Sequence, residues 1–138
     1  MFRFALAPAL FAAAQMLMPG VAHATAGMGC EALDGSGAGV EMNLPRSPGT
    51  PPNWVRVFSA TRKFSSLSMD EDAIPISTRQ AFDGGDTFNI DLTDEDYAEA
   101  VIKIRLLRAE EGDEPPVYIG YLHVVGEGIY PISCIEDE

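Results

Sequence analysis

The chain has 138 residues, of which 46% are hydrophobic, and it carries 9 Lys and Arg against 21 Asp and Glu, a formal net charge of −12. The length fits one domain, and the hydrophobic share is too high for an intrinsically disordered chain. The negative charge argues against nucleic-acid binding, because phosphate recognition depends on clustered Lys and Arg. The composition therefore predicts one globular domain and leaves its function open.

The first 24 residues have the pattern of a cleaved secretory signal peptide. Arg3 supplies a positive charge, an apolar stretch runs from Phe4 to Met18, and residues 21–24 (Val-Ala-His-Ala) offer the small residues that signal peptidase requires. The apolar stretch of about 15 residues is shorter than the ~20 that span a bilayer, and no later segment is long or apolar enough. We expect residues 25–138 to be a single β-rich domain, periplasmic or secreted, with no membrane span.

Two cysteines, Cys30 and Cys134, lie near the two ends of the predicted mature domain. In an oxidising compartment, such a pair favours a disulfide. A redox or metal site is the alternative, but the chain has no Cys-x-x-Cys spacing, and His123 is the only histidine after residue 24. We expect the disulfide to place the first and last strands side by side and to contribute about 4–5 kcal/mol through loop closure.

From Cys30 onward, short segments rich in Val, Ile, Phe, Tyr and Thr alternate with Gly, Pro and Asp turns. This spacing is typical of a small antiparallel β-sandwich or barrel of about 7–9 short strands. The expected strands cover residues 28–33, 40–44, 54–60, 64–69, 100–109, 117–125 and 129–135, with a hairpin over 73–92. The proline-rich run 45–52 is expected to be a loop, and Pro131 indicates that the last strand is an edge strand or carries a bulge.

Residues 73–92 carry the clearest hairpin pattern. The connection at Gly84-Gly85 supplies the positive φ angles that tight hairpin turns need. The residues expected on one face of the first strand are Ile74, Ile76, Thr78, Gln80 and Phe82, and those expected on one face of the second strand are Phe88, Ile90 and Leu92.

Residues 93–109 fit two patterns. Thr93 followed by three acidic residues resembles a helix N-cap, whereas the run 101–107 is rich in β-forming residues. We expect at most one short helical turn at 94–98, followed by a strand over 100–109 whose inward-facing residues are Ile102, Ile104 and Leu106.

Few side chains are candidates for catalysis. A Ser-His-Asp triad would need His123, and the chain has no Gly-x-Ser-x-Gly motif. A carboxylate pair could hydrolyse a glycoside, but a domain of this size has little room for the cleft that such a reaction needs. The acidic clusters could bind calcium, yet they lack the spacing of a calcium loop, and solvated surface acids are the simpler interpretation. We expect no cofactor and no metal.

The acidic residues are unevenly distributed along the chain. Residues 25–68 hold four basic and three acidic side chains, whereas residues 69–138 hold four basic and eighteen acidic ones. If the later strands share a face, that face would attract a cationic partner; if the two parts interleave, the field averages out. Trp54, after the proline-rich loop, is expected either to contact a binding partner or to fill the core beneath the loop. The candidate partner-binding residues are Trp54, Asp94, Glu95, Asp96, Glu110, Glu111, Asp113 and Glu114.

An exported, acidic β domain closed by a terminal disulfide resembles the small periplasmic lysozyme inhibitors. The resemblance is one of architecture, with no shared motif, and it implies no site residues. The sequence thus predicts an exported, non-enzymatic binding or inhibitor-type module that engages a cationic protein of the envelope or the extracellular space. The alternatives are a small secreted hydrolase using His123 or a carboxylate pair, and a structural component of the envelope.

Overall fold

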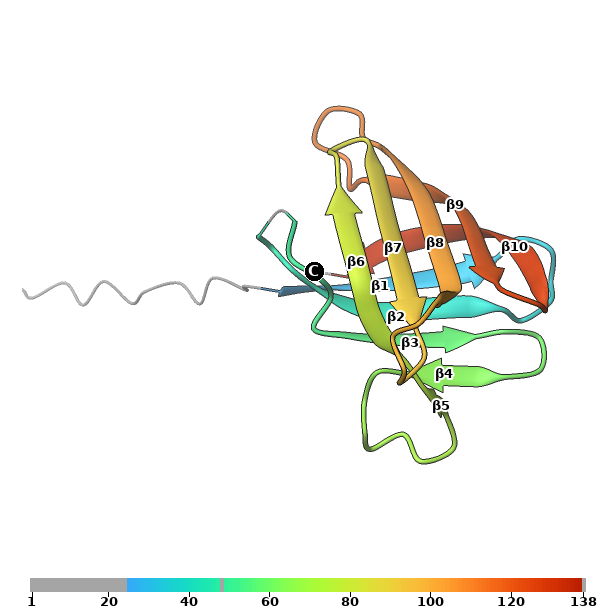
Figure 1. The fold of residues 1–138 in the computed structure, drawn as a ribbon. Coiled ribbons are helices and arrows are strands. Elements are labelled where there is room, and N and C mark those ends of the chain that lie inside the picture. The colour runs from blue at the N-terminus through green and yellow to red at the C-terminus, as the bar shows by residue number, and fades with distance from the viewer. Residues whose placement is uncertain (1–24, 48, 138) are drawn as a thin grey trace, which may run out of the picture.

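The computed structural model describes residues 25–47 and 49–137, and the predicted signal peptide lies outside the described residues. These ranges contain ten strands and no helix (Figure 1), which confirms the expected all-β class. The strands are β1 (Thr25–Ala32), β2 (Gly39–Pro45), β3 (Trp54–Phe58), β4 (Lys63–Ser65), β5 (Ile74–Pro75), β6 (Ser77–Asp83), β7 (Thr87–Thr93), β8 (Ala100–Ala109), β9 (Val117–Val124) and β10 (Gly128–Asp137).

All ten strands belong to one sheet, in the order β5-β4-β3-β2-β1-β10-β9-β8-β7-β6. The two strands at the ends of this order, β5 and β6, are separated in the sequence by Ile76 alone, so the chain itself draws the edges together into a nearly closed barrel. If β5 and β6 are counted as one strand, the barrel has nine strands. In a closed ring with an odd number of strands, the neighbouring pairs cannot all be antiparallel. One pair, β4 with β5, is accordingly parallel.

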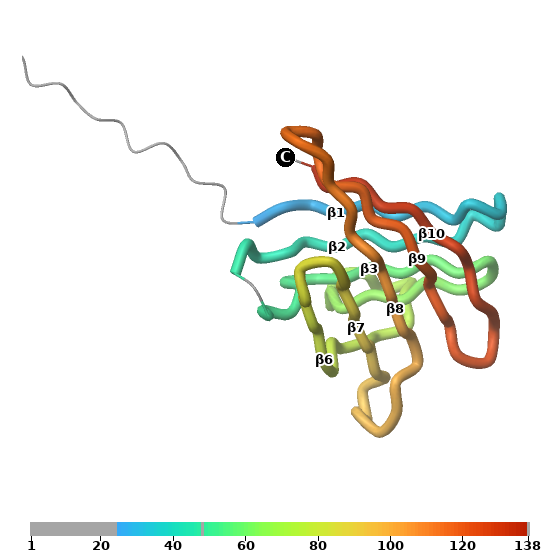
Figure 2. Tube along the Cα trace, turned by 90° about the horizontal axis from the view of Figure 1, so that it is seen from above, coloured from blue at the N-terminus to red at the C-terminus, as the bar shows by residue number. Residues whose placement is uncertain are grey.

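The barrel has two walls whose strands cross at a steep angle. In Figure 1, β6, β7 and β8 run across β1 to β4, and Figure 2 shows the same crossing from above. Inward-facing side chains from both walls fill the space between them, as in orthogonally packed sheets. The largest fully buried side chains are Val40, Met42, Val55, Val57, Ile90, Leu92, Ile102, Ile104, Leu106, Leu122, Val124 and Ile132.

Strand alternation decides which residues enter this core. β8 has the predicted bounds, and its inward positions Ile102, Ile104 and Leu106 are buried as expected. The second strand of the predicted hairpin, β7, likewise buries Phe88, Ile90 and Leu92.

The first strand of the hairpin differs from the expectation. Thr78 pairs with Leu92 and Gln80 pairs with Asp91, so Arg79 is an extra residue in a β-bulge. A bulge shifts the alternation by one residue. Ala81 therefore faces the barrel interior and Phe82 is 58% exposed, which makes the prediction of a single face from Ile74 to Phe82 wrong.

A hydrogen-bonded turn replaces the expected helical turn at 94–98. The Tyr97 N–H donates to the Asp94 carbonyl at 3.3 Å, and Tyr97 has a φ of 54°. A helix needs negative φ, so the chain cannot wind further at this residue.

Pro131 lies in a central strand, which corrects the prediction of an edge strand or a bulge. β10 is paired on both sides, and Pro131 is in regular register with Tyr121 on β9. The Pro131 carbonyl accepts a hydrogen bond from the Leu33 N–H, just beyond the last residue of β1. The Pro131 nitrogen, which has no hydrogen to donate, therefore faces a position just beyond the end of β1, where no ladder hydrogen bond is lost.

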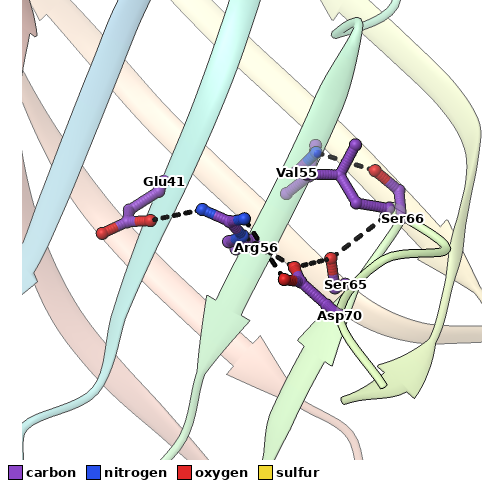
Figure 3. A network of polar contacts seen from close by, with 7 residues as sticks. Glu41, Val55, Arg56, Ser65, Ser66 and Asp70 are labelled. Carbon is purple, nitrogen blue, oxygen red and sulfur yellow. Dashed lines mark hydrogen bonds and ion pairs between the residues drawn. The ribbon is translucent and has the colours of Figure 1, made fainter. Parts of the chain in front are cut away.

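The strand expected at 64–69 ends at Ser65, because the following loop folds back onto β3. The Asp70 carboxylate accepts hydrogen bonds from Arg56 Nε at 2.7 Å, from Arg56 Nη2 at 3.2 Å and from the Ser65 hydroxyl at 2.5 Å. Figure 3 shows this network, in which Arg56 also approaches Glu41 on β2. The network fixes the loop that makes the parallel connection from β4 to β5.

The predicted disulfide between Cys30 and Cys134 is present. The two cysteines stand directly opposite each other on β1 and β10, and both are buried. The first and last strands of the domain are therefore neighbours, as expected.

Candidate functional site

One end of the barrel opens into a cavity of about 360 Å³. β1 begins at this end, and β2, β6, β8 and β10 end there. We call it the mouth cavity. Small-molecule pockets have volumes from roughly 300 Å³ upward, so the mouth cavity lies at the small end of that range. Its lining includes Met28, Leu44, Arg46, Asp83, Phe88, Arg108, Tyr118, Glu136 and Asp137.

The floor of the mouth cavity is apolar. Met28 on β1 and Phe88 on β7 are buried, and Leu44 near the end of β2 packs against the core. Leu44 and Phe88 lie at the ends of inward-facing rows, and Met28 follows Ala26 in the inward row of β1, which places these side chains between the core and the opening. Met28 and Phe88 are 2% and 8% exposed, so the floor closes the core and leaves little apolar surface open to the cavity.

Tyr118 and Glu136 form a polar pair in the wall of the cavity. The Tyr118 hydroxyl donates to Glu136 Oε1 at 2.5 Å. Burial of the phenol and, next, its hydrogen bond to Glu136 raise the pKa of Tyr118 well above its ordinary range. Tyr118 therefore remains a protonated donor at neutral pH.

Arg108 stands beside this pair, because it is in register with Tyr118 across β8 and β9. Its Nη2 donates to Glu110 Oε2 at 2.7 Å. Its Nε is buried and has no hydrogen-bond partner in the described residues. Buried N–H groups are nearly always paired in folded proteins, so this donor is an exception; it lies within the wall and has almost no surface open to the cavity.

The charges lining the mouth cavity sum to a small negative excess. Three carboxylates, Asp83, Glu136 and Asp137, face two guanidinium groups, Arg46 and Arg108. The ion pair with Glu110 offsets the charge of Arg108. The cavity therefore favours a positively charged group over an anion.

The two predicted acidic loops lie at opposite ends of β8. Residues 94–96 precede the strand and residues 110–114 follow it, and ten extended residues separate the two loops by about 30 Å. The structure thus divides the predicted contact residues into two groups and places Glu110, Glu111, Asp113 and Glu114 beside the mouth cavity. The role of both groups as partner contacts stays a prediction.

Trp54 is neither a core residue nor a lining residue of the mouth cavity. Val55 and Val57 take the inward positions of β3, so Trp54 lies half-buried on the outer face. The Arg56 guanidinium stands 5.4 Å from its ring centroid, in cation–π geometry. The alternative that Trp54 fills the core is therefore wrong, and its role as a contact residue stays a prediction.

His123 lies on the outer wall of the barrel, in register with Lys103 on β8 and Ile129 on β10. It borders a shallow depression together with Arg79, Asp91 and Glu99. No serine, threonine or cysteine is among the described residues that line this depression. The structure therefore brings no nucleophile to His123 for the triad that the hydrolase alternative requires.

The strand order keeps the acidic part of the chain together. β1 to β4 come from residues 25–68 and are neighbours in the sheet, and β6 to β10 come from the later residues and are also neighbours. The two parts do not interleave. Residues 77–137, which form β6 to β10 and their loops, bring fourteen acidic and four basic side chains to one side of the barrel, which we call the acidic half. Asp70, Glu71 and Asp72 lie instead in the loop beside β3 and β4.

Sequence reasoning missed the polar wall of the mouth cavity, although a signal was present. Arg108 continues the inward row of Ile104 and Leu106, and Glu136 continues the inward row of Ile132 and Cys134. A charged residue at the end of an apolar row marks the point where a barrel interior meets its opening.

The chain matches no known protein family, no curated protein and no solved structure. Within residues 25–47 and 49–137, no helix is long and apolar enough to cross a membrane. In the same ranges, no three His, Cys, Asp or Glu side chains gather closely enough to hold a metal ion. The function must therefore be argued from the geometry of this chain alone.

Proposed function

We propose that this protein is an exported, non-enzymatic binding module of the inhibitor type, whose acidic half engages a cationic protein of the envelope or the extracellular space. The observation that carries the proposal is the strand order, because it converts the charge asymmetry of the sequence into an asymmetry between the two sides of the barrel. A surface of one sign steers an oppositely charged partner and speeds association.

Two further features support this proposal. The Cys30–Cys134 disulfide suits an oxidising compartment outside the cytosol, where the predicted signal peptide would deliver the chain. The exposed acids at 110–114 follow the end of β8 that borders the mouth cavity, and Glu110 binds the lining residue Arg108. Concave sites are where binding proteins commonly receive a partner group.

The test is the salt dependence of association with cationic proteins. The purified protein, with its disulfide formed, is passed over an immobilised panel of cationic proteins, lysozyme included, at two ionic strengths. Between about 0.01 M and about 0.15 M salt, the Debye length falls from about 30 Å to about 8 Å. We expect at least one member to bind, with an association rate that falls about tenfold or more over this range. Binding to none of the panel at low salt would count against the proposal.

Matched variants locate the contact. Glu111→Gln with Glu114→Gln removes two charges from the acidic half, and Glu31→Gln with Glu41→Gln removes two from the β1–β2 wall; all four side chains are exposed. The first double variant should slow association several-fold, and the second should leave it nearly unchanged. Equal effects of the two variants would mean that overall net charge, and not the acidic half, drives binding.

A third variant distinguishes the two acidic loops. Glu95→Gln with Glu99→Gln makes the same charge change at the far end of β8. If the contact lies beside the mouth cavity, this variant should slow association less than the change at Glu111 and Glu114.

A further inference from the structure

We propose that the outer side of β9 and its two neighbours is the docking surface for the cationic partner, and that this partner presents apolar side chains next to its basic ones. The inference rests on the proposed function and deepens it, because it adds a contact surface and the chemistry of the partner. The residues that form this surface, which we call the outer apolar face, are Leu107, Val117, Ile119, Tyr121 and Ile135.

β9 is apolar on both of its faces. Its inward residues belong to the core, while Val117, Ile119 and Tyr121 on the opposite face are exposed. A strand with one face on the core and the other in water normally alternates apolar with polar residues. β7 of the same sheet follows this rule, and its outer residues are Thr87, Asn89 and Asp91. The outer face of β9 therefore has the composition of a surface that a partner covers.

The strand register joins the five apolar side chains into one patch. Ile119 stands opposite Leu107 on β8, and Val117 stands opposite Ile135 on β10. Opposite residues in an antiparallel pair have Cβ atoms about 4.5–5.5 Å apart. The exposed fractions range from 42% for Tyr121 to 68% for Ile135. Single exposed apolar side chains are ordinary on protein surfaces, whereas a contiguous patch is typical of an interaction site.

The charges beside the outer apolar face are acidic, which sets the charge of the partner. Residues 109–137, which include β9 and β10, contain seven acidic side chains and no lysine or arginine. Glu111, Asp113 and Glu114 lie in the loop that leads into Val117, and their side chains make no ion pair within the described residues. Acids beside an apolar patch are complementary to a surface that combines basic and apolar side chains.

The basic residues on the outer side of β8 lie away from the acidic loop. Arg105 is opposite Tyr121, and its Nη2 donates to Asp91 Oδ1 at 2.6 Å. Lys103 is opposite His123, one outward position further along β9. The patch therefore has an acidic end at Val117, where the basic residues of the partner would lie.

A second copy of this chain fits the outer apolar face less well than a cationic partner does. Burial of the five side chains favours any apolar partner, and the charge selects among them. Each copy carries a net charge of −12, so two copies repel each other at low ionic strength. A cationic partner is attracted under the same conditions.

The test uses a peptide probe, acetyl-Trp-Leu-Gly-Arg-Arg-Arg-amide, and does not depend on finding the natural partner. Its apolar block and its basic block match the outer apolar face and the adjacent loop at 110–114. Two-dimensional amide NMR spectra of the isotope-labelled protein, with its disulfide formed, are recorded at low salt as the peptide is added. We expect a Kd of about 1 mM or tighter, a value set by the small size of the peptide. The signals that shift should belong to β8, β9, β10 and the loop at 110–114.

Two further peptides separate the two contributions. Acetyl-Ser-Ser-Gly-Arg-Arg-Arg-amide lacks the apolar block, and acetyl-Trp-Leu-Gly-Gln-Gln-Gln-amide lacks the charge. Each should bind about tenfold more weakly or worse. The inference is overturned if the first peptide does not bind at about 10 mM, if the serine peptide binds as well, or if the shifts lie on β2 and β3.

A double variant assigns the binding to the outer apolar face. Ile119→Thr with Ile135→Thr removes apolar surface and keeps β-branched side chains, which suit a strand. It should weaken the first peptide to the level of the serine peptide. Met69→Thr with Phe82→Thr makes a similar change at exposed positions in the β4–β5 loop and on β6, and this matched control should bind as the unaltered protein does. The peptide series uses the unaltered protein, so it decides the matter even if a variant fails to fold.

The outcomes separate this inference from the proposed function. A cationic protein of the panel that binds the unaltered protein and the Ile119→Thr, Ile135→Thr variant equally well would leave the proposed function standing and overturn the inference. A panel in which nothing binds, together with a peptide that needs both of its blocks, would count against the proposed function and support the docking surface. A dimer in sedimentation velocity that the double variant dissociates would assign the face to a second copy and overturn the inference.

Discussion

Gly120 of β9 lies against the backbone of β8 so closely that a Cβ at this position would stand 1.8 Å from the carbonyl oxygen of Arg105. Real Cβ atoms essentially never approach another atom within 3.0 Å. Glycine is therefore the one residue that fits here, because it lets two neighbouring strands come together on the inner side of the barrel wall.

Gly120→Ala should destabilise the protein strongly. The clash is with backbone, which cannot move aside as a flexible side chain would, and we expect the free energy of unfolding to fall by about 3 kcal/mol. Urea denaturation measures this loss. Gly29→Ala on β1 is the matched control, since a Cβ there meets nothing within 4 Å, and its effect should stay within about 0.5 kcal/mol. Similar losses in the two variants would show that the close approach at Gly120 is not limiting.

The disulfide should carry a large share of the stability. Cys30 and Cys134 are separated by 104 positions, and in the chain-entropy model cross-linking so long a loop stabilises the fold by about 4–5 kcal/mol. The double variant Cys30→Ala with Cys134→Ala should lose about this amount in urea denaturation. Reduction of the unaltered protein should produce a comparable loss. An unchanged denaturation midpoint after either treatment would contradict the prediction.

The network around Asp70 should make the stability depend on pH in the acid range. The hydrogen bond from Arg56 and then that from Ser65 lower the pKa of Asp70 from 3.8 to about 2. A carboxyl whose folded pKa is lowered stabilises the fold above its unfolded pKa, and this contribution is lost as the pH falls from about 4 through about 2. Asp70→Asn should therefore be less stable than the unaltered protein at neutral pH, and the difference should shrink over that window.

Urea midpoints measured from neutral pH down to about pH 2 test this dependence. Asp72→Asn is the control, because Asp72 is an exposed neighbour whose side chain makes no hydrogen bond or ion pair within the described residues. Its difference from the unaltered protein should be small and should not change between pH 4 and pH 2. A difference for Asp70→Asn that stays constant in that window would refute the role of the network.

Tyr118 should ionise only at strongly alkaline pH. Its pKa is raised above the ordinary 10.0, first by burial and then by the Glu136 hydrogen bond. A group whose pKa is higher in the folded state than in the unfolded state stabilises the fold at pH values below the unfolded pKa. This stabilisation is lost as the pH rises above about 10. In an ultraviolet titration, the unaltered protein should show a late tyrosinate phase that coincides with alkaline unfolding. Tyr118→Phe should lack that phase; a phase that survives the substitution belongs to another tyrosine.

Local pattern was enough to predict much of the fold. Alternation of apolar and polar residues identified β7 and β8 and the inward faces of both, because a side chain's face depends only on strand parity. The same rule failed in β6, where the bulge at Arg79 inserts one residue and reverses the parity beyond it. Thr78, Arg79 and Gln80 include no glycine or proline, so no residue typical of a bulge indicated it.

The sequence by itself determined the all-β class, the pairing of Cys30 with Cys134 and the concentration of acidic residues after residue 68, since composition and local spacing carry these properties. Only the tertiary structure decided that the acidic strands remain neighbours, that the two acidic loops stand at opposite ends of β8, and that Arg108, Tyr118 and Glu136 share one cavity wall. Each of these arrangements depends on how the barrel closes and on the register between neighbouring strands. Closure and register are set by the packing of the whole chain and not by any single segment.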